Sequence, residues 1–306
     1  MIATDIAVIG AGVAGLGAAT AAARRGLRVL VVERMGAGGQ VMNVENIANF
    51  PGHPEGISGF ELGPLLQEEA EAAGAEFLLD TVLGLANEGG LHVLRCEGET
   101  VQARAVIVTA GSARRKLDVP GEERLKGRGV SHCASCDGPL FRGQAVCVVG
   151  GGDSAFGEAQ VLAAHAAHVT IVFREPRPHA QAALVDAVAP LPNVTLLPGA
   201  TVIAVEGGDG VTGVRLRLAS EREETVPAGG VFVYAGLEAD SGFLRGALAL
   251  DGAGRIVADA RFRSSVPGVF AAGDIRAGAA YLLAAAVEEG RSAGAAAADY
   301  LDEARR

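Results

Sequence analysis

The chain has 306 residues, of which 49% are hydrophobic, 20% are charged and 4% are aromatic. This length and this share of hydrophobic residues allow two compact domains and exclude an intrinsically disordered protein. The formal net charge of -10 argues against nucleic acid as a partner.

The apolar stretches are all short. Each is interrupted by glycine, arginine or an acid before the roughly 18 residues that a membrane-spanning helix needs. The N-terminal residues also lack a charged segment followed by a cleavable apolar one. We therefore expect a cytoplasmic protein that has no membrane partner.

The N-terminal segment predicts a strand, a glycine-rich turn and a helix in succession. Residues 5–9 are typical of a buried parallel strand, and the alanine-rich segment 16–25 is helical. The glycines between them are Gly10, Gly12 and Gly15. They allow a tight turn and let backbone N–H groups approach a pyrophosphate. A second strand, 29–32, ends at Glu33, where a carboxylate can accept hydrogen bonds from a ribose diol. Together these features predict a dinucleotide-binding unit.

A loop rich in glycine and proline follows and carries Gln40 and Asn49. Such a loop cannot form regular structure, so we expect it to wrap over something or to link two surfaces. Residues 59–73 return to helical periodicity, and 75–108 hold short alternating runs that are compatible with strands. The last of these runs is a buried strand that ends in a small-residue turn at Gly111.

A Cys-x-x-Cys pair, Cys133 and Cys136, is the central chemical feature of the chain. This spacing lets both sulfurs face one side of a turn, which lowers the pKa of one thiol and makes the pair reversibly oxidisable. We expect no metal site, because the other cysteines, Cys96 and Cys147, are isolated in apolar, strand-like surroundings. Asp137 follows the pair directly and suits proton transfer to a leaving thiolate.

A second strand, glycine turn and strand pattern follows the dithiol. Strand 145–149 enters the turn, and strand 169–173 occupies the place that 29–33 has in the first unit. The turn residues expected to meet a nucleotide are Gly150, Gly152 and Ser154. The pattern continues to a strand at 231–236 and an apparent return link at 237–241. The chain therefore contains two dinucleotide-type folds.

The C-terminal part supplies another short strand and a long helix. The strand ends at Gly273 and Asp274, which places an acid at its carboxyl end. An alanine-rich helix over 281–300 then closes the pattern.

These motifs together resemble the low-molecular-weight thioredoxin reductases over essentially the whole chain. The matching motifs, in order, are G-x-G-x-x-G, GGQ, NFPG, TAG, CASCDG, GGGDSA and VPGVFAAGD. The resemblance implies an α/β protein with two Rossmann-like dinucleotide-binding domains of three-layer ββα type, one inserted in the other. An FAD domain would comprise 1–114 and 240–306, and an NAD(P)-type domain, 115–239, would carry the dithiol. It further implies a homodimer that reduces thioredoxin or a similar small redox protein and rotates one domain against the other.

The resemblance also assigns roles to single residues. Cys136 would lie against the flavin, Cys133 would attack the substrate disulfide, and Asp137 would be the acid-base group. The expected FAD-binding residues are Gly10, Gly12, Gly15 and Glu33 for the ADP half, Gln40 and Asn49 near the flavin, Asp274 at the ribityl or pyrophosphate portion, and also Gly111, Gly273, Leu282 and Leu283.

Two departures from the family pattern concern the cofactors. The His-Arg-Arg cluster that holds the 2'-phosphate of NADPH falls on Phe173-Arg174-Glu175, with His179 in place of a further arginine. Only Arg174 survives, so we expect NADPH to be a poor donor and rank NADH slightly above a non-nucleotide donor. The family's Arg-Gln-Ala falls on Tyr281-Leu282-Leu283, which leaves only backbone N–H groups to meet the flavin carbonyl.

Three other functions remain open at this point. The enzyme could take electrons from a ferredoxin-type protein, or it could run backward as a dithiol oxidase that passes electrons to oxygen. A flavin-bound redox sensor is the non-enzyme alternative. Asp137 argues against the sensor, because a sensor needs no acid to protonate a leaving thiolate.

Overall fold

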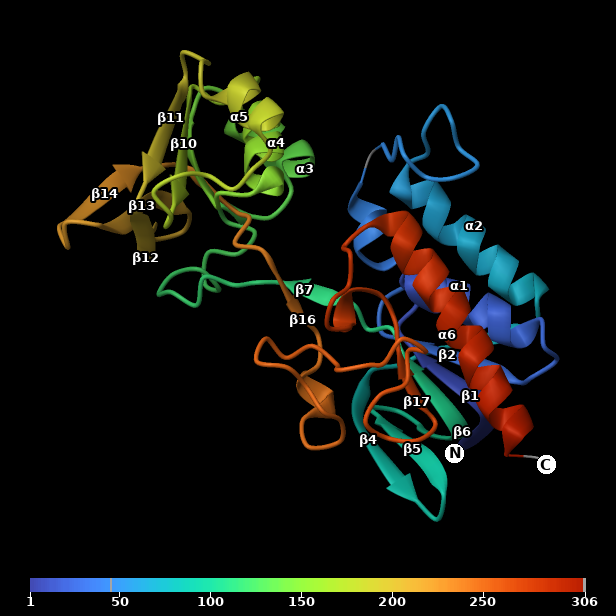
Figure 1. The fold of residues 1–306 in the computed structure, drawn as a ribbon. Coiled ribbons are helices and arrows are strands. Elements are labelled where there is room, and N and C mark those ends of the chain that lie inside the picture. The colour runs from blue at the N-terminus through green and yellow to red at the C-terminus, as the bar shows by residue number, and fades with distance from the viewer. Residues whose placement is uncertain (45, 305–306) are drawn as a thin grey trace. The chain divides into compact units, whose positions relative to one another are not determined.

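The structure is a computed structural model that describes residues 1–44 and 46–304. The chain forms two compact units: unit 1 comprises Met1–Ala113 and Glu238–Arg306, and unit 2 comprises Arg114–Leu237. The chain crosses between them twice, in strands β7 (Ser112–Arg114) and β16 (Leu237–Ala239), which pair in a two-stranded sheet (Figure 1). The segment expected only as a return link thus contains a strand, because its backbone pairs with a segment far away in the sequence.

Unit 1 is built on a seven-stranded sheet with the order β3-β2-β1-β6-β5-β4, and β17 also pairs with β6. Its strands are β1 (Ile2–Ile9), β2 (Val29–Glu33), β3 (Ala75–Leu79), β4 (Val82–Glu88), β5 (Leu91–Cys96), β6 (Thr100–Val108) and β17 (Val269–Ala271). Strand β1 pairs in parallel with β2 and β6, β2 with β3, and β17 with β6. Strand β5 pairs antiparallel with both β4 and β6. Because the parallel strands all point one way, their carboxyl ends meet at one edge, where dinucleotides bind in such folds.

Three helices cover one face of this sheet: α1 (Val13–Ala23), α2 (Gly59–Ala72) and α6 (Leu283–Glu303) (Figure 1). The alternation of β1 explains the two cores of unit 1. Ile6 and Val8 pack on the helical side, and Ala7 and Ile9 pack against the opposite layer. Among the described residues, no helix combines the length and the apolar character that a membrane span requires.

Helices α1 and α6 pack closely because glycines face the neighbouring backbone. A Cβ atom on Gly290 would lie 1.9 Å from the Ala14 carbonyl oxygen, and one on Gly294 would lie 2.4 Å from that of Ala18. Helix α1 begins at Val13, three residues before the expected start, because the helix opens inside the glycine motif. Helix α6 begins after Leu282, because the preceding Tyr281 has a φ of 54° and cannot belong to a right-handed helix.

Unit 2 has three layers. Its central sheet is parallel with the order β11-β10-β9-β15-β8, helices α3, α4 and α5 lie on one face, and the antiparallel sheet β12-β13-β14 lies on the other (Figure 1). The strands are β8 (Val130–Ser131), β9 (Ala145–Val149), β10 (His168–Phe173), β11 (Val194–Pro198), β12 (Ala200–Gly207), β13 (Val211–Leu218), β14 (Glu223–Pro227) and β15 (Gly230–Val233); the helices are α3 (Ala134–Asp137), α4 (Asp153–Ala163) and α5 (Ala182–Val188). The expected α/β class with two Rossmann-like folds is confirmed.

Candidate active site

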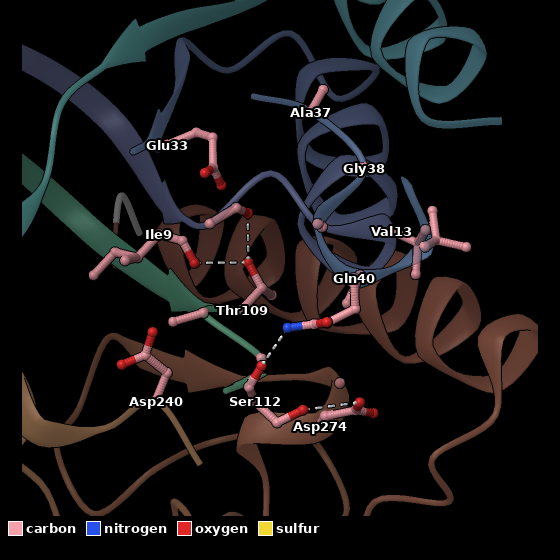
Figure 2. Close-up of a pocket in the computed structure, with 18 of the residues that line it drawn as sticks. Ile9, Val13, Glu33, Ala37, Gly38, Gln40, Thr109, Ser112, Asp240 and Asp274 are labelled. Atoms are coloured by element: carbon pink, nitrogen blue, oxygen red, sulfur yellow. Dashed lines mark hydrogen bonds between the residues drawn. The ribbon is translucent and has the colours of Figure 1, made fainter. Parts of the chain in front are cut away.

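A cavity of about 860 Å³ opens at the carboxyl ends of β1, β2 and β6 in unit 1 (Figure 2). This volume is within the range of about 300–1,000 Å³ that is usual for ligand sites. The figure shows Glu33 and Asp274 well apart in the site, with Thr109 and Gln40 between them. Residues of different chemistry therefore line different parts of the cavity.

The first glycine turn forms one wall of the cavity. Gly10 has a φ of 98°, and a Cβ atom there would lie 2.7 Å from the Thr109 carbonyl oxygen, so only glycine fits. At Gly12, by contrast, no atom of the described chain lies within 4 Å of an added Cβ. Gly15 lies below the turn, where a Cβ would meet the Gly10 oxygen at 1.9 Å. Gly12 therefore faces open space, while Gly15 serves the contact between the helix and the turn.

The N-terminus of α1 is free to bind an anion. In the structure as described, no side chain caps this helix, and its first turn carries no acid. The first N–H groups of a helix have no partner inside the helix, and the helix dipole adds positive charge there. This end of α1 suits a phosphate group.

Glu33 is fixed by the backbone around the turn. One carboxylate oxygen accepts a hydrogen bond from the Ala11 N–H at 2.7 Å, and the other accepts one from the Met35 N–H at 2.9 Å. The carboxylate is thus oriented beside the glycine turn, where an acid suits a ribose diol.

Gln40, Ser112 and Asp274 are linked in another part of the cavity. The Gln40 Nε2 donates to the Ser112 carbonyl oxygen at 3.1 Å, and the Ser112 hydroxyl donates to Asp274 Oδ2 at 3.5 Å (Figure 2). Burial raises the pKa of the Asp274 carboxyl, the Ser112 hydrogen bond partly offsets this, and the charge of Glu289 adds to the rise. Asp274 is therefore more easily protonated than an exposed aspartate.

A partly buried ion pair braces the turn that carries Asp274. Glu289 on α6 accepts hydrogen bonds from the Arg276 guanidinium and, at 3.0 Å, from the Gly273 N–H. The side chains of Arg276 and Glu289 are only 17% and 16% exposed, so solvent screens the pair weakly. This contact connects the end of β17 to α6.

The N-terminus of α6 also faces the cavity. Tyr281, Leu282 and Leu283 all line it. Among the described side chains none caps this helix, so its first N–H groups are available to a ligand. The Tyr281 ring lies under the Arg255 guanidinium, 5.6 Å from ring centroid to Cζ, which holds the ring in place.

In unit 2 the two cysteines form a disulfide, with their Cα atoms 5.4 Å apart. Cys136 is exposed and Cys133 is partly buried. The Cys136 N–H donates to the Cys133 Sγ at 3.2 Å. Ser131, which the sequence did not single out, donates through its hydroxyl to Asp137 Oδ2 at 2.5 Å and accepts from the Cys133 N–H at 3.1 Å. Its hydroxyl therefore ties the acid to the dithiol.

The second glycine turn has different surroundings from the first. A Cβ on Gly150 would lie 2.3 Å from the Tyr234 carbonyl oxygen, and one on Gly152 would lie 3.0 Å from the His179 Nε2. Ser154 and Arg174 are exposed. The imidazole of His179 thus lies over the turn, whereas the equivalent place at Gly12 is open.

The structure brings most of the expected FAD-binding residues together. The cavity lining includes Gly10, Gly12, Glu33, Gln40, Gly111, Gly273, Asp274, Leu282 and Leu283. Asn49 is exposed, and among the described residues it is not part of this lining. Its loop contributes Phe50 and Pro51 to a separate cavity of about 530 Å³ beside α2 and α6.

Sequence reasoning missed several residues of the cavity. Thr109 is buried and donates to the carbonyl oxygens of Ile9 and Gly10 at 2.9 and 3.0 Å, which fixes the glycine turn. Thr109 comes directly before Ala110 and Gly111 at the end of β6, and this position in the sequence could have identified it. Arg34 and Asp240 also line the cavity and form an ion pair at 3.1 Å, but no local pattern joins residues so far apart in sequence.

Comparison with known proteins supports one assignment. Residues 4–290 match the family model described as pyridine nucleotide-disulphide oxidoreductase. A thioredoxin reductase of Treponema pallidum (strain Nichols) is 36% identical over 299 residues, which cover 97% of each chain. The crystal structure of Lactococcus lactis thioredoxin reductase in its FR conformation superposes with a TM-score of 0.91 at 33% identity, over 98% of this chain and 99% of that one. A ferredoxin-flavin thioredoxin reductase from Clostridium acetobutylicum gives a TM-score of 0.55 at 28% identity over 99% of each chain. The chain therefore belongs to the pyridine nucleotide-disulphide oxidoreductase family, in its thioredoxin reductase branch.

Proposed function

We propose that this chain reduces the disulfide of thioredoxin or a similar small redox protein, with electrons that pass through bound FAD to the Cys133–Cys136 pair. The observation that carries the proposal is the dithiol turn itself. The two cysteines are joined in a disulfide, and an acid, Asp137, is held next to them by Ser131. A reversible disulfide with a positioned acid is the equipment of thiol-disulfide exchange.

The cavity of unit 1 fits FAD. The uncapped N-terminus of α1 and the open space at Gly12 suit the pyrophosphate, and Glu33 suits the ribose of the ADP half. Asp274, with Gln40, would hold the ribityl side, and the N-terminus of α6 would meet the flavin ring. When bound, FAD supplies a store of two electrons that can pass to the disulfide.

The residues of unit 2 then carry the exchange. Two electrons and two protons convert the Cys133–Cys136 disulfide to a dithiol. Cys133 passes its proton to Asp137, and the resulting thiolate attacks the substrate disulfide. One substrate sulfur leaves as a thiolate and takes that proton from Asp137. Cys136 next attacks the Cys133 sulfur of the mixed disulfide, which releases the second substrate thiol and restores the Cys133–Cys136 bond.

The proposed function is tested by a single half-reaction. Purified protein loaded with FAD and reduced anaerobically with dithionite should be reoxidised by oxidised thioredoxin, with one substrate disulfide reduced for each two electrons. Because the donor is chemical, the result does not depend on which natural donor the enzyme uses. Flavin that stays reduced in the presence of excess thioredoxin would contradict the proposal.

The second glycine turn favours a donor other than NADPH, either NADH or a ferredoxin-type protein. The place that Glu33 has in unit 1 falls on Phe173, which is 3% exposed and packs against Phe156. Glu175 is exposed in the adjoining loop, and a carboxylate there repels a 2'-phosphate. His179 lies over the turn where a pyrophosphate would approach. A relative is named as a ferredoxin-flavin thioredoxin reductase, which is consistent with this alternative.

We expect NADPH to reduce the bound flavin only at concentrations far above micromolar, and more slowly than the better of NADH and a reduced ferredoxin. The loss of two charge-assisted hydrogen bonds to the 2'-phosphate, at about 1.5–3 kcal/mol each, amounts to about two to four decades of affinity. Stopped-flow loss of flavin absorbance with the three donors side by side measures this. Fast, saturable reduction by micromolar NADPH would show that the loop over 173–179 does not select against it.

A cytoplasmic location and a homodimeric state complete the proposal. The homodimeric state rests on the resemblance to thioredoxin reductases, and the cytoplasmic location rests on the short, interrupted apolar stretches of the sequence. Sedimentation of the FAD-loaded protein would report the oligomeric state directly.

A further inference from the structure

The backbone between the two cysteines is held by two side chains that the exchange mechanism does not use. The N–H of Ala134, a fully buried residue, donates to Glu158 Oε2 and to the Tyr234 hydroxyl oxygen, both at 3.1 Å. The Tyr234 hydroxyl in turn donates to Glu158 Oε2 at 3.3 Å. Glu158 comes from α4, and Tyr234 follows β15, so two separate elements converge on the dithiol turn.

The internal repeat shows that this use of Tyr234 is specific to unit 2. Tyr234 follows β15 in a Val-Tyr-Ala-Gly sequence, and Thr109 follows β6 in a Val-Thr-Ala-Gly sequence. The short Thr109 side chain hydrogen-bonds the first glycine turn. The Tyr234 backbone oxygen lies against Gly150 of the second glycine turn, and the longer Tyr234 side chain reaches the dithiol turn instead.

We propose that Glu158 and Tyr234 are positioning residues for the dithiol: they hold the Ala134 amide so that the Cys136 N–H points at the Cys133 Sγ. That N–H lies 3.2 Å from the sulfur. A hydrogen bond donated to a sulfur favours its thiolate form, which is the nucleophile in disulfide exchange. The inference rests on the proposed role of the dithiol and adds the residues that keep Cys133 reactive.

Several charged groups surround Cys133, and they oppose one another. The carboxylates of Asp137 and Glu158 disfavour a thiolate, whereas Arg114, whose guanidinium donates to the His132 carbonyl oxygen at 2.7 Å, favours it. The His132 imidazole is engaged with the Val233 carbonyl oxygen at 3.0 Å. A useful test must therefore separate the hydrogen bond of Glu158 from its charge.

Glu158→Gln and Glu158→Ala make that separation, because both remove the charge but only glutamine keeps a hydrogen-bond acceptor. In a Cys136→Ser background, the rate at which iodoacetamide alkylates Cys133 is measured against pH. We expect the alanine variant to react about tenfold more slowly at neutral pH than the glutamine variant, a ratio equivalent to about 1.4 kcal/mol. Tyr234→Phe keeps the hydrogen bond from the Ala134 N–H to Glu158. Its rate of Cys133 alkylation should therefore fall less than about threefold below that of its parent.

The other two thiols do not obscure this measurement. Burial raises the pKa of Cys96 to about 11, with further rises from the charges of Asp80 and Glu99, and burial alone raises that of Cys147 to about 12. Both stay protonated at neutral pH, and peptide mapping assigns the modified cysteine. Gln160→Ala, on an exposed position of α4, is the matched control and should not change the pH profile.

Each outcome decides the inference. Identical pH profiles for Glu158→Gln and Glu158→Ala, with Tyr234→Phe unchanged, would overturn it. If both Glu158 variants lose thermal stability without a difference in alkylation, the contact serves folding only and the inference also fails. Should Glu158→Ala not fold, the double variant Glu158→Gln/Tyr234→Phe is compared with Glu158→Gln: slower alkylation of Cys133 in the double variant supports the inference, and equal rates overturn it. Alkylation needs neither FAD nor thioredoxin, so failure of the proposed function would appear in the reoxidation experiment and not here.

Discussion

Cys136→Ser should stop catalytic reduction of a protein disulfide and accumulate a covalent complex with the substrate. In this variant Cys133 can still attack the substrate disulfide, but no second thiol remains to resolve the mixed disulfide. The complex should appear on a non-reducing gel and disappear on addition of a reductant. Turnover should fall below detection, because each enzyme molecule stops at the unresolved mixed disulfide.

Cys133→Ser should also stop turnover, but it should trap no substrate. The remaining Cys136 thiolate should instead give a long-wavelength charge-transfer band with bound FAD, as the resemblance to thioredoxin reductases implies. Cys96→Ser is the matched control and should keep turnover, because its thiol is half-buried with a pKa raised to about 11. Equal trapping by both variants of the pair would remove the assignment of Cys133 as the attacking residue.

Gly12→Val should abolish retention of FAD while the protein stays folded. No described atom lies within 4 Å of a Cβ at this position, so an added side chain begins in open space. It would occupy the space through which a pyrophosphate approaches the N–H groups of α1. The loss of two hydrogen bonds from these N–H groups to the charged pyrophosphate, at about 1.5–3 kcal/mol each, corresponds to about two to four decades of FAD affinity. Titration of the apo-protein with FAD, followed by flavin fluorescence, measures this.

Two further glycine variants separate binding from folding. Gly15→Ala places a Cβ 1.9 Å from the Gly10 oxygen, so we expect it to destabilise unit 1 by about 1–3 kcal/mol. Gly157→Ala lies within α4, where the described chain leaves the Cβ free space, and should raise stability by about 0.5–1 kcal/mol without any effect on FAD. If Gly12→Val bound FAD as tightly as the parent chain, the turn would not be the pyrophosphate site.

Much of the fold could be predicted from the sequence because its signals are local. The hydrophobic strands that enter Gly10 and Gly150 needed only neighbouring residues to be recognised, and the first leads into a helix as expected. The dithiol is recognisable for the same reason, since Cys133 and Cys136 are three residues apart and close a disulfide within one turn. Element ends were less predictable: α6 starts late because Tyr281 adopts a positive φ.

The sequence by itself thus determined the fold class, the two glycine turns and the redox pair, because each depends on side chains that are adjacent in the chain. Only the tertiary structure decided which distant residues serve them. It brought Glu158 and Tyr234 to the Ala134 amide, and it left Asn49 outside the described lining of the large cavity. It also distinguished two turns of similar sequence, since Gly12 faces open space and Gly152 faces His179. These contacts depend on how strands and helices are packed, and a local pattern carries no information about the residue that packing brings from elsewhere in the chain.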